Sequence, residues 1–446
     1  MAQRETAPAA DFEDLEPLYK EIRQPPPEEG QRPARILNLA LAAGAKGHDT
    51  AGPGWLAYIP GGGLPTAALA DLIARTTNRF VTEWEAGPVM AEIEATVVRW
   101  FCGLFGYGSQ ARGILTSGGS MANFSALVTA RHNRLGENFQ RGTIYFTSET
   151  HGSVAKAATL AGFPRAALRL VPVTPQLRMD ARALKTLVAA DRAAGLRPLT
   201  VVASAGTTNT GAVDGIEELA DVAQQEDLWL HVDGAYGGFF QLTDRGKTAF
   251  AGITRADSIT LDPHKGMFLP YGTGALIVRD GQALRAAHEV HGPYLQDLAP
   301  EAEIPNFADY SAEMSRDARG LRVWLPVQLH GLAAFRQALD EKLDLARVIA
   351  VRLREIEGLE VPWDPELSIV AFRARSDAAS IELMSRINAT RRVVLSSTVV
   401  EGRFTIRIAV LSFRTHRDRI DNLLELIASA ARNLPGDPAK RGQPRR

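Results

Sequence analysis

The stretch Ser258-Ile-Thr-Leu-Asp-Pro-His-Lys-Gly-Met-Phe268 predicts a short buried strand that leads into a lysine. Ile259 and Leu261 alternate with polar neighbours, and the turn that follows carries Lys265 at the carboxyl end of the strand. Open α/β sheets bind their ligands at this edge. A lysine held among apolar residues is costly to keep charged, so its amine becomes available for a Schiff base. The same stretch also fits a solvated lysine in a strand-to-loop turn.

The region from residue 113 to 278 alternates short β-branched runs with helical segments. Six such runs with helices between them predict a mostly parallel sheet that is covered on both faces. A strand-like run over residues 113–115 precedes them. The six expected strands are Thr143–Thr147, Leu168–Val171, Leu199–Ala203, Leu228–Val232, Ser258–Leu261 and Thr273–Val278.

Length and composition indicate a globular protein with enough material for a large core and two domains. The chain has 446 residues, of which 45% are hydrophobic and 23% are charged. Its 50 Lys and Arg residues balance 51 Asp and Glu residues, so we expect neither nucleic acid nor a membrane surface as a partner. The lone cysteine, Cys102, excludes an intramolecular disulfide and fits a reducing cytoplasm. With no apolar run of about 18 residues and no signal core, neither secretion nor a membrane span is expected.

A glycine-rich loop, Thr116-Ser-Gly-Gly-Ser-Met-Ala-Asn123, follows the strand-like run and opens a helix. Backbone N–H groups at a helix N-terminus form an anion site, so a phosphate could bind at Gly119, Ser120 and Met121. The loop has neither the Gly-Lys-Ser/Thr of a Walker motif nor the spacing of a dinucleotide fingerprint. On its own it is equally typical of a capped helix after a strand.

A carboxylate, Asp233, ends the apolar run Leu228–Val232. A carboxylate at that position needs a partner, and a pyridinium nitrogen is one that keeps both groups charged. The methyl group of Ala235, two residues later, could then lie flat against a ring. The alternative is that Asp233 caps the next helix.

Two more loops follow strands of the same predicted sheet. Glu149-Thr-His-Gly-Ser153 places His151 at the carboxyl edge, where an imidazole can stack on a planar cofactor or act as an acid or base, although a lone histidine is more often structural. Ser204-Ala-Gly-Thr-Thr-Asn209 adds hydroxyl groups, including that of Thr208. A phosphate cradle, two groups that sandwich a ring, an acid for a ring nitrogen and a Schiff-base lysine together predict pyridoxal phosphate as the cofactor.

The sequence resembles the group II pyridoxal-phosphate amino-acid decarboxylases, which include aromatic amino-acid, histidine and glutamate decarboxylases. The resemblance covers most of the chain and implies the type I, aspartate-aminotransferase-like fold of pyridoxal-phosphate-dependent transferases. That fold has a large, mostly parallel seven-stranded sheet domain and a small C-terminal α/β domain. The matching stretches are Ala57-Tyr-Ile-Pro60, Trp84-Glu-Ala-Gly-Pro88, Thr116–Asn123, His151-Gly-Ser153, Gly206-Thr-Thr208, His231-Val-Asp-Gly-Ala-Tyr236 and Asp262-Pro-His-Lys265.

The resemblance also implies a role for each matching residue. Lys265 would form the internal aldimine, Asp233 would pair with the ring nitrogen and His151 would stack on the ring. His264 would lie beside the substrate carboxylate, and decarboxylation would pass through a quinonoid intermediate. Tyr310, in Ala308-Asp-Tyr-Ser-Ala312, is similar to the family's proton-donating tyrosine, which reaches the partner's active site, although an aromatic residue could instead anchor a loop. The implied assembly is a homodimer with active sites at the interface and no metal.

We expect four parts in the chain. A helical arm that serves dimerisation is predicted over residues 1–65, the cofactor-binding domain over 66–330, the small domain over 331–435 and a basic, disordered tail over 436–446. Residues 291–313 lack periodicity and hold three prolines, which is typical of a functional lid or a disordered loop.

The predicted activity is decarboxylation of an L-amino acid, with an aromatic side chain favoured, to its amine and carbon dioxide. Tyr58, Pro60 and Thr82 are the predicted substrate contacts, and Thr82 lies where some aromatic decarboxylases carry phenylalanine. Asp262 stands where aromatic decarboxylases often carry asparagine, and it adds negative charge near the lysine. The alternatives are an aldehyde-forming oxidative deaminase, another lyase or an aminotransferase, for which Arg407 or Arg414 could clamp a carboxylate. A non-enzymatic cofactor-binding homologue is a further alternative.

Overall fold

The computed structural model describes residues 8–289, 306–432 and 434. The chain divides into two compact units. The larger unit holds residues 61–346 and 363–369, and the smaller unit holds the residues up to 60, residues 347–362 and those from 370 onward. The predicted boundaries at residues 65 and 330 remain predictions.

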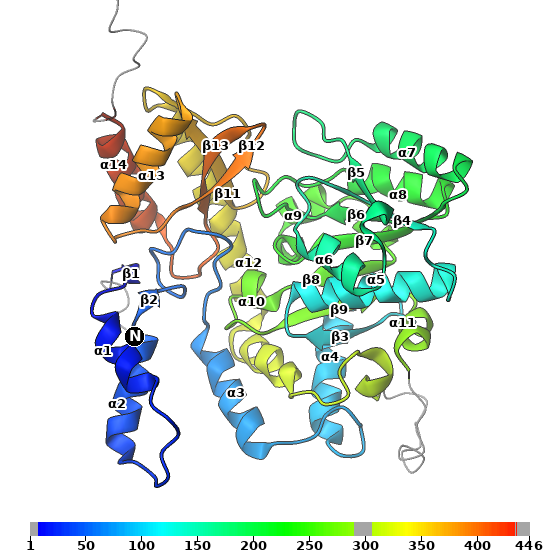
Figure 1. Cartoon of the computed structure of the whole chain (residues 1–446), viewed down its shortest axis with the longest axis horizontal. Helices are drawn as coiled ribbons and strands as arrows, with labels where there is room; N and C mark the ends of the chain where they lie inside the picture. Colours follow the sequence, from blue (N-terminus) through cyan, green and yellow to red (C-terminus); the bar gives the residue numbers. More distant parts are fainter. Residues whose placement is uncertain (1–7, 290–305, 433, 435–446) are drawn as a thin grey trace, which may run out of the picture. The chain divides into compact units, whose positions relative to one another are not determined.

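A seven-stranded sheet with the strand order β3-β9-β8-β7-β6-β4-β5 forms the centre of the larger unit (Figure 1). Neighbouring strands are parallel, except that β9 runs antiparallel to both β3 and β8. Most strands are buried along their whole length, as expected for a sheet with both faces covered. The strands are β3 (Arg112–Thr116), β4 (Gly142–Thr147), β5 (Leu168–Val171), β6 (Arg197–Ser204), β7 (Trp229–Gly234), β8 (Ser258–Leu261) and β9 (Gly274–Val278).

The helices of this unit follow the strands in sequence, as in other α/β proteins. Helix α5 packs on β8 and β9, while α7 and α8 pack on β6. The α-helices are α3 (Pro65–Thr77), α4 (Pro88–Leu104), α5 (Gly119–Leu135), α6 (Ser153–Leu160), α7 (Ala181–Ala193), α8 (Ile216–Gln225), α9 (Asp244–Ala249), α10 (Pro263–Gly266), α11 (Gly281–His288) and α12 (Arg319–Arg354). Short 3₁₀ helices are η2 (Arg165–Ala167), η3 (Gly238–Leu242), η4 (Ile253–Arg255) and η6 (Phe307–Tyr310).

The smaller unit contains two sheets and four helices of its own among the described residues. Strands β1 (Ala10–Asp11) and β2 (Gly47–His48) pair with each other, and a second sheet has the order β10-β11-β13-β12. Its strands are β10 (Leu359–Glu360), β11 (Ile369–Ala374), β12 (Ser396–Val400) and β13 (Arg403–Ala409). The helices are α1 (Leu15–Ile22), α2 (Pro33–Gly44), α13 (Asp377–Ala389) and α14 (Arg417–Arg432).

The six strands predicted from β-branched runs are confirmed as β4 to β9. Helix α12 is broken at Gly331, which has a φ of 71°. The N-terminal helix α1 begins at Leu15, and the residues before it, Ala10 and Asp11, pair with residues 47 and 48. Within the described ranges, no helix combines the length and the apolar character that crossing a bilayer requires.

Candidate active site

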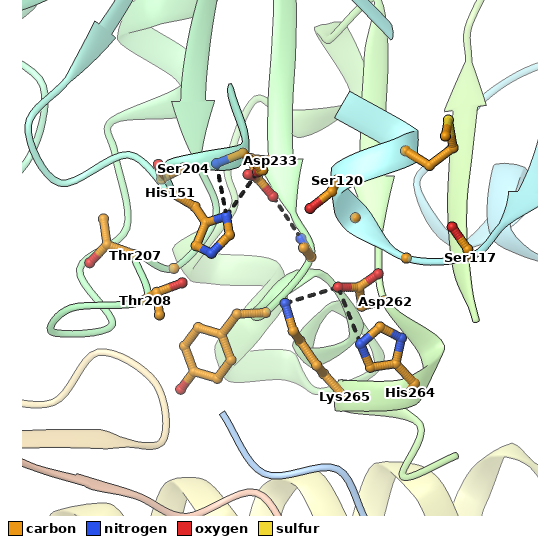
Figure 2. A pocket seen from close by; sticks show the side chains of 17 residues that line it. Ser117, Ser120, His151, Ser204, Thr207, Thr208, Asp233, Asp262, His264 and Lys265 are labelled. Atoms are coloured by element: carbon orange, nitrogen blue, oxygen red, sulfur yellow. Dashed lines mark hydrogen bonds and ion pairs between the residues drawn. The ribbon is translucent and has the colours of Figure 1, made fainter. Parts of the chain in front are cut away.

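A cavity of about 270 Å³ lies in the larger unit, where loops after several strands of the sheet converge (Figure 2). Parallel strands bring their carboxyl ends to one edge, so residues far apart in sequence meet there. The cavity is lined by Ser117, Gly118, Gly119, Ser120, Met121, His151, Ser153, Ser204, Gly206, Thr207, Thr208, Asp233, Ala235, Tyr236, Asp262, His264 and Lys265.

Lys265 enters this cavity from the short helix α10, directly after β8. Its Nζ lies 2.9 Å from Oδ2 of Asp262, and the Asp262 side chain is only 3% exposed. The Lys265 side chain is therefore paired with a buried carboxylate three residues before it in the sequence. The alternative of a solvated surface lysine does not fit, because the Lys265 side chain is 19% exposed and lines the cavity.

His264 lies beside the same carboxylate. Its Nε2 is 3.7 Å from Oδ2 of Asp262, and its Nδ1 donates a hydrogen bond to the carbonyl oxygen of Thr273 at 2.7 Å. Burial lowers the pKa of His264, while the Asp262 carboxylate opposes that shift. A neutral imidazole with its proton on Nδ1 leaves Nε2 as an acceptor at the cavity wall.

Asp233 is the next-to-last residue of β7, and its side chain lines the cavity and is 7% exposed. Its Oδ1 accepts a hydrogen bond from the N–H of Ala235 at 3.1 Å, and its Oδ2 accepts one from Nδ2 of Asn123 at 2.9 Å. Both donors are neutral. A buried carboxylate with neutral donors is suited to a cationic partner in the cavity.

His151 lies in the loop between β4 and α6 and also lines the cavity. Its Nδ1 is 3.3 Å from the backbone nitrogen of Ser153 and 2.8 Å from that residue's hydroxyl. Since a backbone N–H can only donate, Nδ1 is an acceptor and the imidazole proton lies on Nε2. The hydroxyl of Thr208 lines the same wall, as predicted.

The glycine-rich loop approaches the cavity closely at the N-terminus of α5. A Cβ atom added to Gly119 would lie 3.0 Å from Cβ of Ala235 and 3.0 Å from Oδ2 of Asp262, so only glycine fits without movement. The first turn of a helix leaves backbone N–H groups without intrahelical acceptors. Gly119 and Ser120 therefore place backbone N–H groups at one end of the cavity, which fits the expected anion site.

Four predicted site residues do not line this cavity. Thr82 is buried, with its carbonyl accepting from the N–H of Ala308 and its hydroxyl accepting from the N–H of Arg316. Tyr310 ends η6 and packs, half-buried, on the hydrophobic core of the larger unit. Tyr58 and Pro60 belong to the smaller unit. Of the predicted loop 291–313, residues up to 305 lie outside the described residues.

The residues around the cavity fit pyridoxal phosphate. The donor set offers N–H groups for a phosphate, a carboxylate for a ring nitrogen and a primary amine for the carbonyl carbon. His151 and Ala235 both line the space where a flat ring would lie. In addition, Oδ1 of Asp262 is buried and has no hydrogen-bond partner among the described residues, so the wall retains an acceptor for a bound group.

Asn123 and His231 are site residues that the sequence analysis missed. Both are 1% exposed, and Asn123 donates directly to Asp233. The signal that could have found them is the alternation of hydrogen-bonding side chains at Trp229, His231 and Asp233 along an otherwise apolar strand. Side chains two residues apart on a strand share one face of the sheet, and buried polar groups there need hydrogen-bond partners.

Comparison with known proteins agrees with this site. Residues 45–375 match the pyridoxal-dependent decarboxylase conserved domain. The chain is 35% identical to an aromatic-L-amino-acid decarboxylase of Bacillus atrophaeus, over 97% of this chain and 93% of that protein. It is 30% identical to an L-2,4-diaminobutyrate decarboxylase of Rhizobium meliloti, over 82% of this chain and 76% of that protein. The crystal structure of Oryza sativa TDC with PLP and tryptamine is similar over 97% of this chain and 94% of that one, with a TM-score of 0.91 and 28% identity.

Proposed function

We propose that this chain, which belongs to the pyridoxal-dependent decarboxylase family, converts an aromatic L-amino acid into its amine and carbon dioxide. It is a carboxy-lyase that uses pyridoxal phosphate. The observation that carries the proposal is the cavity in which Lys265, Asp233 and the glycine-rich loop meet. The aromatic side chain is supported by the 35% identity to the Bacillus atrophaeus enzyme.

When bound, pyridoxal phosphate supplies an electron sink for the bond that breaks at the substrate's α-carbon. Lys265 must first present a neutral amine, and Oδ2 of Asp262 lies 2.9 Å from Nζ, within reach to accept its proton. Asp233 would pair with the ring nitrogen of bound pyridoxal phosphate and would stabilise a positive charge there. Nε2 of His264 lies 3.7 Å from the same carboxylate oxygen of Asp262 and is placed to take the lysine proton onward.

Tyr310 is proposed as the proton donor to the α-carbon. Because Tyr310 does not line the cavity of its own chain, this role fits a tyrosine supplied to the second subunit of a homodimer. The exposed apolar face of the N-terminal helices supports the dimer, since neither α1 nor α2 has a buried residue. The large exposed apolar side chains there include Tyr19, Leu37 and Leu41. We also propose a cytoplasmic location, which fits the lone cysteine.

An aminotransferase is less well supported. Arg407 and Arg414 were the candidates for a carboxylate clamp, and both engage backbone oxygens within the smaller unit. Arg407 donates to the carbonyl oxygen of Tyr58 at 3.2 Å, and Arg414 donates to that of Ala51 at 2.9 Å. An aldehyde-forming reaction would additionally consume oxygen, so its products separate it from simple decarboxylation.

Incubation of the purified protein with a panel of amino acids tests the proposed function. The panel holds the twenty common amino acids, 5-hydroxytryptophan, dopa and L-2,4-diaminobutyrate, and carbon dioxide, amine and peroxide are measured together. We expect equal amounts of carbon dioxide and amine from an aromatic substrate, without peroxide. Selective release of amine from L-2,4-diaminobutyrate would show that the substrate is not aromatic. Formation of peroxide in proportion to carbon dioxide would show that the reaction is an oxidative deamination rather than a simple decarboxylation.

A further inference from the structure

A buried chain of hydrogen bonds runs behind the cavity and ends at Asp233. Nε1 of Trp229 lies 2.8 Å from Oγ of Ser258, which lies 2.8 Å from Nδ1 of His231. Nε2 of His231 is 3.0 Å from Oδ1 of Asn123, whose Nδ2 lies 2.9 Å from Oδ2 of Asp233. None of these five residues is more than 7% exposed, so their polar groups depend on one another.

Strand geometry explains why these groups meet. Positions 229, 231 and 233 alternate along β7 and so share one face of the sheet. On the parallel neighbour β8, Ser258 is the register partner of His231, and Thr260 is the partner of Asp233. Helix α5 packs over these strands and brings Asn123 onto the same face.

The two ends of this series of hydrogen bonds determine the direction of the bonds next to them and of those made by Asn123. An indole N–H can only donate, so Trp229 donates to the hydroxyl of Ser258. A carboxylate can only accept, so Nδ2 of Asn123 must point at Asp233. The Asn123 oxygen then faces Nε2 of His231 and the hydroxyl of Thr260, which is 2.7 Å away, and both must donate to it. Nε2 of His231 therefore carries a proton, and if the ring is neutral, Nδ1 accepts from the hydroxyl of Ser258.

Burial agrees with a neutral ring, because it lowers the pKa of His231 to about 4 although the nearby Asp233 carboxylate opposes that shift. At neutral pH the imidazole thus carries one proton, which lies on Nε2 because Nε2 donates to Asn123, and Nδ1 accepts from the hydroxyl of Ser258.

A branch of the same chain reaches His151. Nδ2 of Asn123 also lies 2.9 Å from Oγ of Ser153, and its second proton is donated there. The Ser153 hydroxyl then donates its own proton to Nδ1 of His151 at 2.8 Å. The orientation of one amide group therefore serves two cavity residues, Asp233 and His151.

We infer that His231 and Asn123 are positioning residues that hold Asp233 as an oriented hydrogen-bond acceptor for the ring nitrogen of the cofactor. The same two residues keep the proton of His151 on Nε2. This inference rests on the cofactor named above. It adds a layer of residues that touch neither cofactor nor substrate and act through Asp233 and His151.

Binding of pyridoxamine 5′-phosphate to the full-length apoprotein, measured by calorimetry, tests the inference without any reaction and without a bond to Lys265. His231→Phe removes the donor to Asn123, and we expect the affinity to fall about tenfold to a hundredfold, as for the loss of a hydrogen bond to a charged group. His231→Gln keeps an N–H donor near the position of Nε2 and is expected to stay within about threefold of the wild type. Val232→Ala is the matched control, because Val232 is fully buried on the other face of β7.

An unchanged affinity in His231→Phe, or an equal loss in Val232→Ala, would overturn the inference. Failure of the wild type to bind would instead overturn the cofactor assignment on which it rests. A second measurement needs no variant, because ¹⁵N spectra of histidine-labelled protein report the tautomer of each ring. We expect a protonated Nε2 and an unprotonated Nδ1 for both His231 and His151, and the opposite tautomer at His231 would contradict the bond directions.

Discussion

His231 makes the protein's stability depend on pH at mildly acidic values. Burial lowers its pKa from 6.5 to about 4, so below about pH 6.5 the unfolded chain takes up a proton that the folded protein does not bind. The free energy of unfolding contributed by this residue is complete above pH 6.5 and falls by about 3 kcal/mol as the pH drops to 4. In His231→Gln this loss is absent, and urea unfolding at several pH values measures the difference.

A buried carboxylate, Asp214, acts in the opposite direction in the same pH range. Burial raises its pKa to about 6, although it accepts hydrogen bonds from the N–H groups of Met179 and Ser204. The folded protein then takes up a proton before the unfolded chain does, which adds stability as the pH falls. The contributions of His231 and Asp214 therefore oppose each other in the wild type, so the difference between the wild type and His231→Gln, rather than the wild-type curve alone, measures the contribution of His231. Parallel curves for the wild type and His231→Gln would contradict the account of His231.

Tyr310 is a second residue whose replacement has a specific expected result. Tyr310→Phe keeps the aromatic ring that packs on the core and removes only the hydroxyl. If this hydroxyl protonates the α-carbon, amine formation falls at least about tenfold and aldehyde, ammonia and peroxide rise in the presence of oxygen. Product analysis by chromatography measures all of them. An unchanged yield of amine would remove Tyr310 from the proposed role.

At the scale of elements, a buried ion pair joins α4 and β3 to the chain that follows η6. Arg316 lies 2.6 Å from Oε1 of Glu94, and their side chains are 0% and 1% exposed. The same guanidinium donates to the carbonyl oxygen of Leu115, whose N–H donates to Glu94. Glu94→Ala removes the buried partner of Arg316 and leaves it the more exposed Glu313, 3.9 Å from Nε, so we expect unfolding to require about 3–5 kcal/mol less.

Denaturant unfolding measures that cost, and the same helix offers the control. Glu92 pairs with Arg99 on α4, but both side chains are about half exposed. Glu92→Ala is expected to change the stability by less than about 1 kcal/mol. Equal effects of the two substitutions would show that burial does not determine the strength of the Glu94 pair.

Elements differ in how far the sequence predicts them. The strands β4 to β9 were predictable, because apolar β-branched runs bounded by turns have few other interpretations. Helix α2 was missed, since all its residues are exposed or half-exposed and its pattern faces no core within the chain. Strand β10 was missed because it has only two residues, and β12 was missed because it is partly exposed and lacks a clear apolar pattern. Both are recognised as strands from their pairing with β11 and β13.

The site shows a similar division. Residues after strand ends were predictable because the sheet brings those ends together, and Lys265, Asp233 and His151 all line one cavity. Asp262 was expected to add negative charge near Lys265, but their direct ion pair was not predicted, because it depends on how α10 turns. Asn123 also escaped prediction, since its contacts with Asp233 and His231 lie more than 100 residues away in sequence.

At the scale of the whole molecule, we expect the exposed apolar face of α2 to be covered by a second copy of the chain. Leu37 and Leu41 are 63% and 73% exposed on that helix. Replacing both with glutamate would place charges in the proposed interface and convert the dimer to monomers, because an unpaired charge is costly to bury. Light scattering during size-exclusion chromatography measures the mass.

The control for this prediction is Ile381→Glu on α13, where the side chain is 49% exposed. This variant should keep the mass of two chains. A dimer that survives both substitutions on α2 would contradict the proposed role of this helix, and a monomeric wild type would exclude the homodimer.

The central claim is that Lys265 holds pyridoxal phosphate in the cavity at the carboxyl ends of the strands. Reduction of the purified protein with borohydride fixes a covalent link between the cofactor and its lysine, and peptide mass spectrometry then locates the modified residue. We predict a phosphopyridoxyl group on Lys265 and none in Lys265→Ala. Modification of a different lysine, or a wild-type protein that takes up no pyridoxal phosphate, would contradict the account.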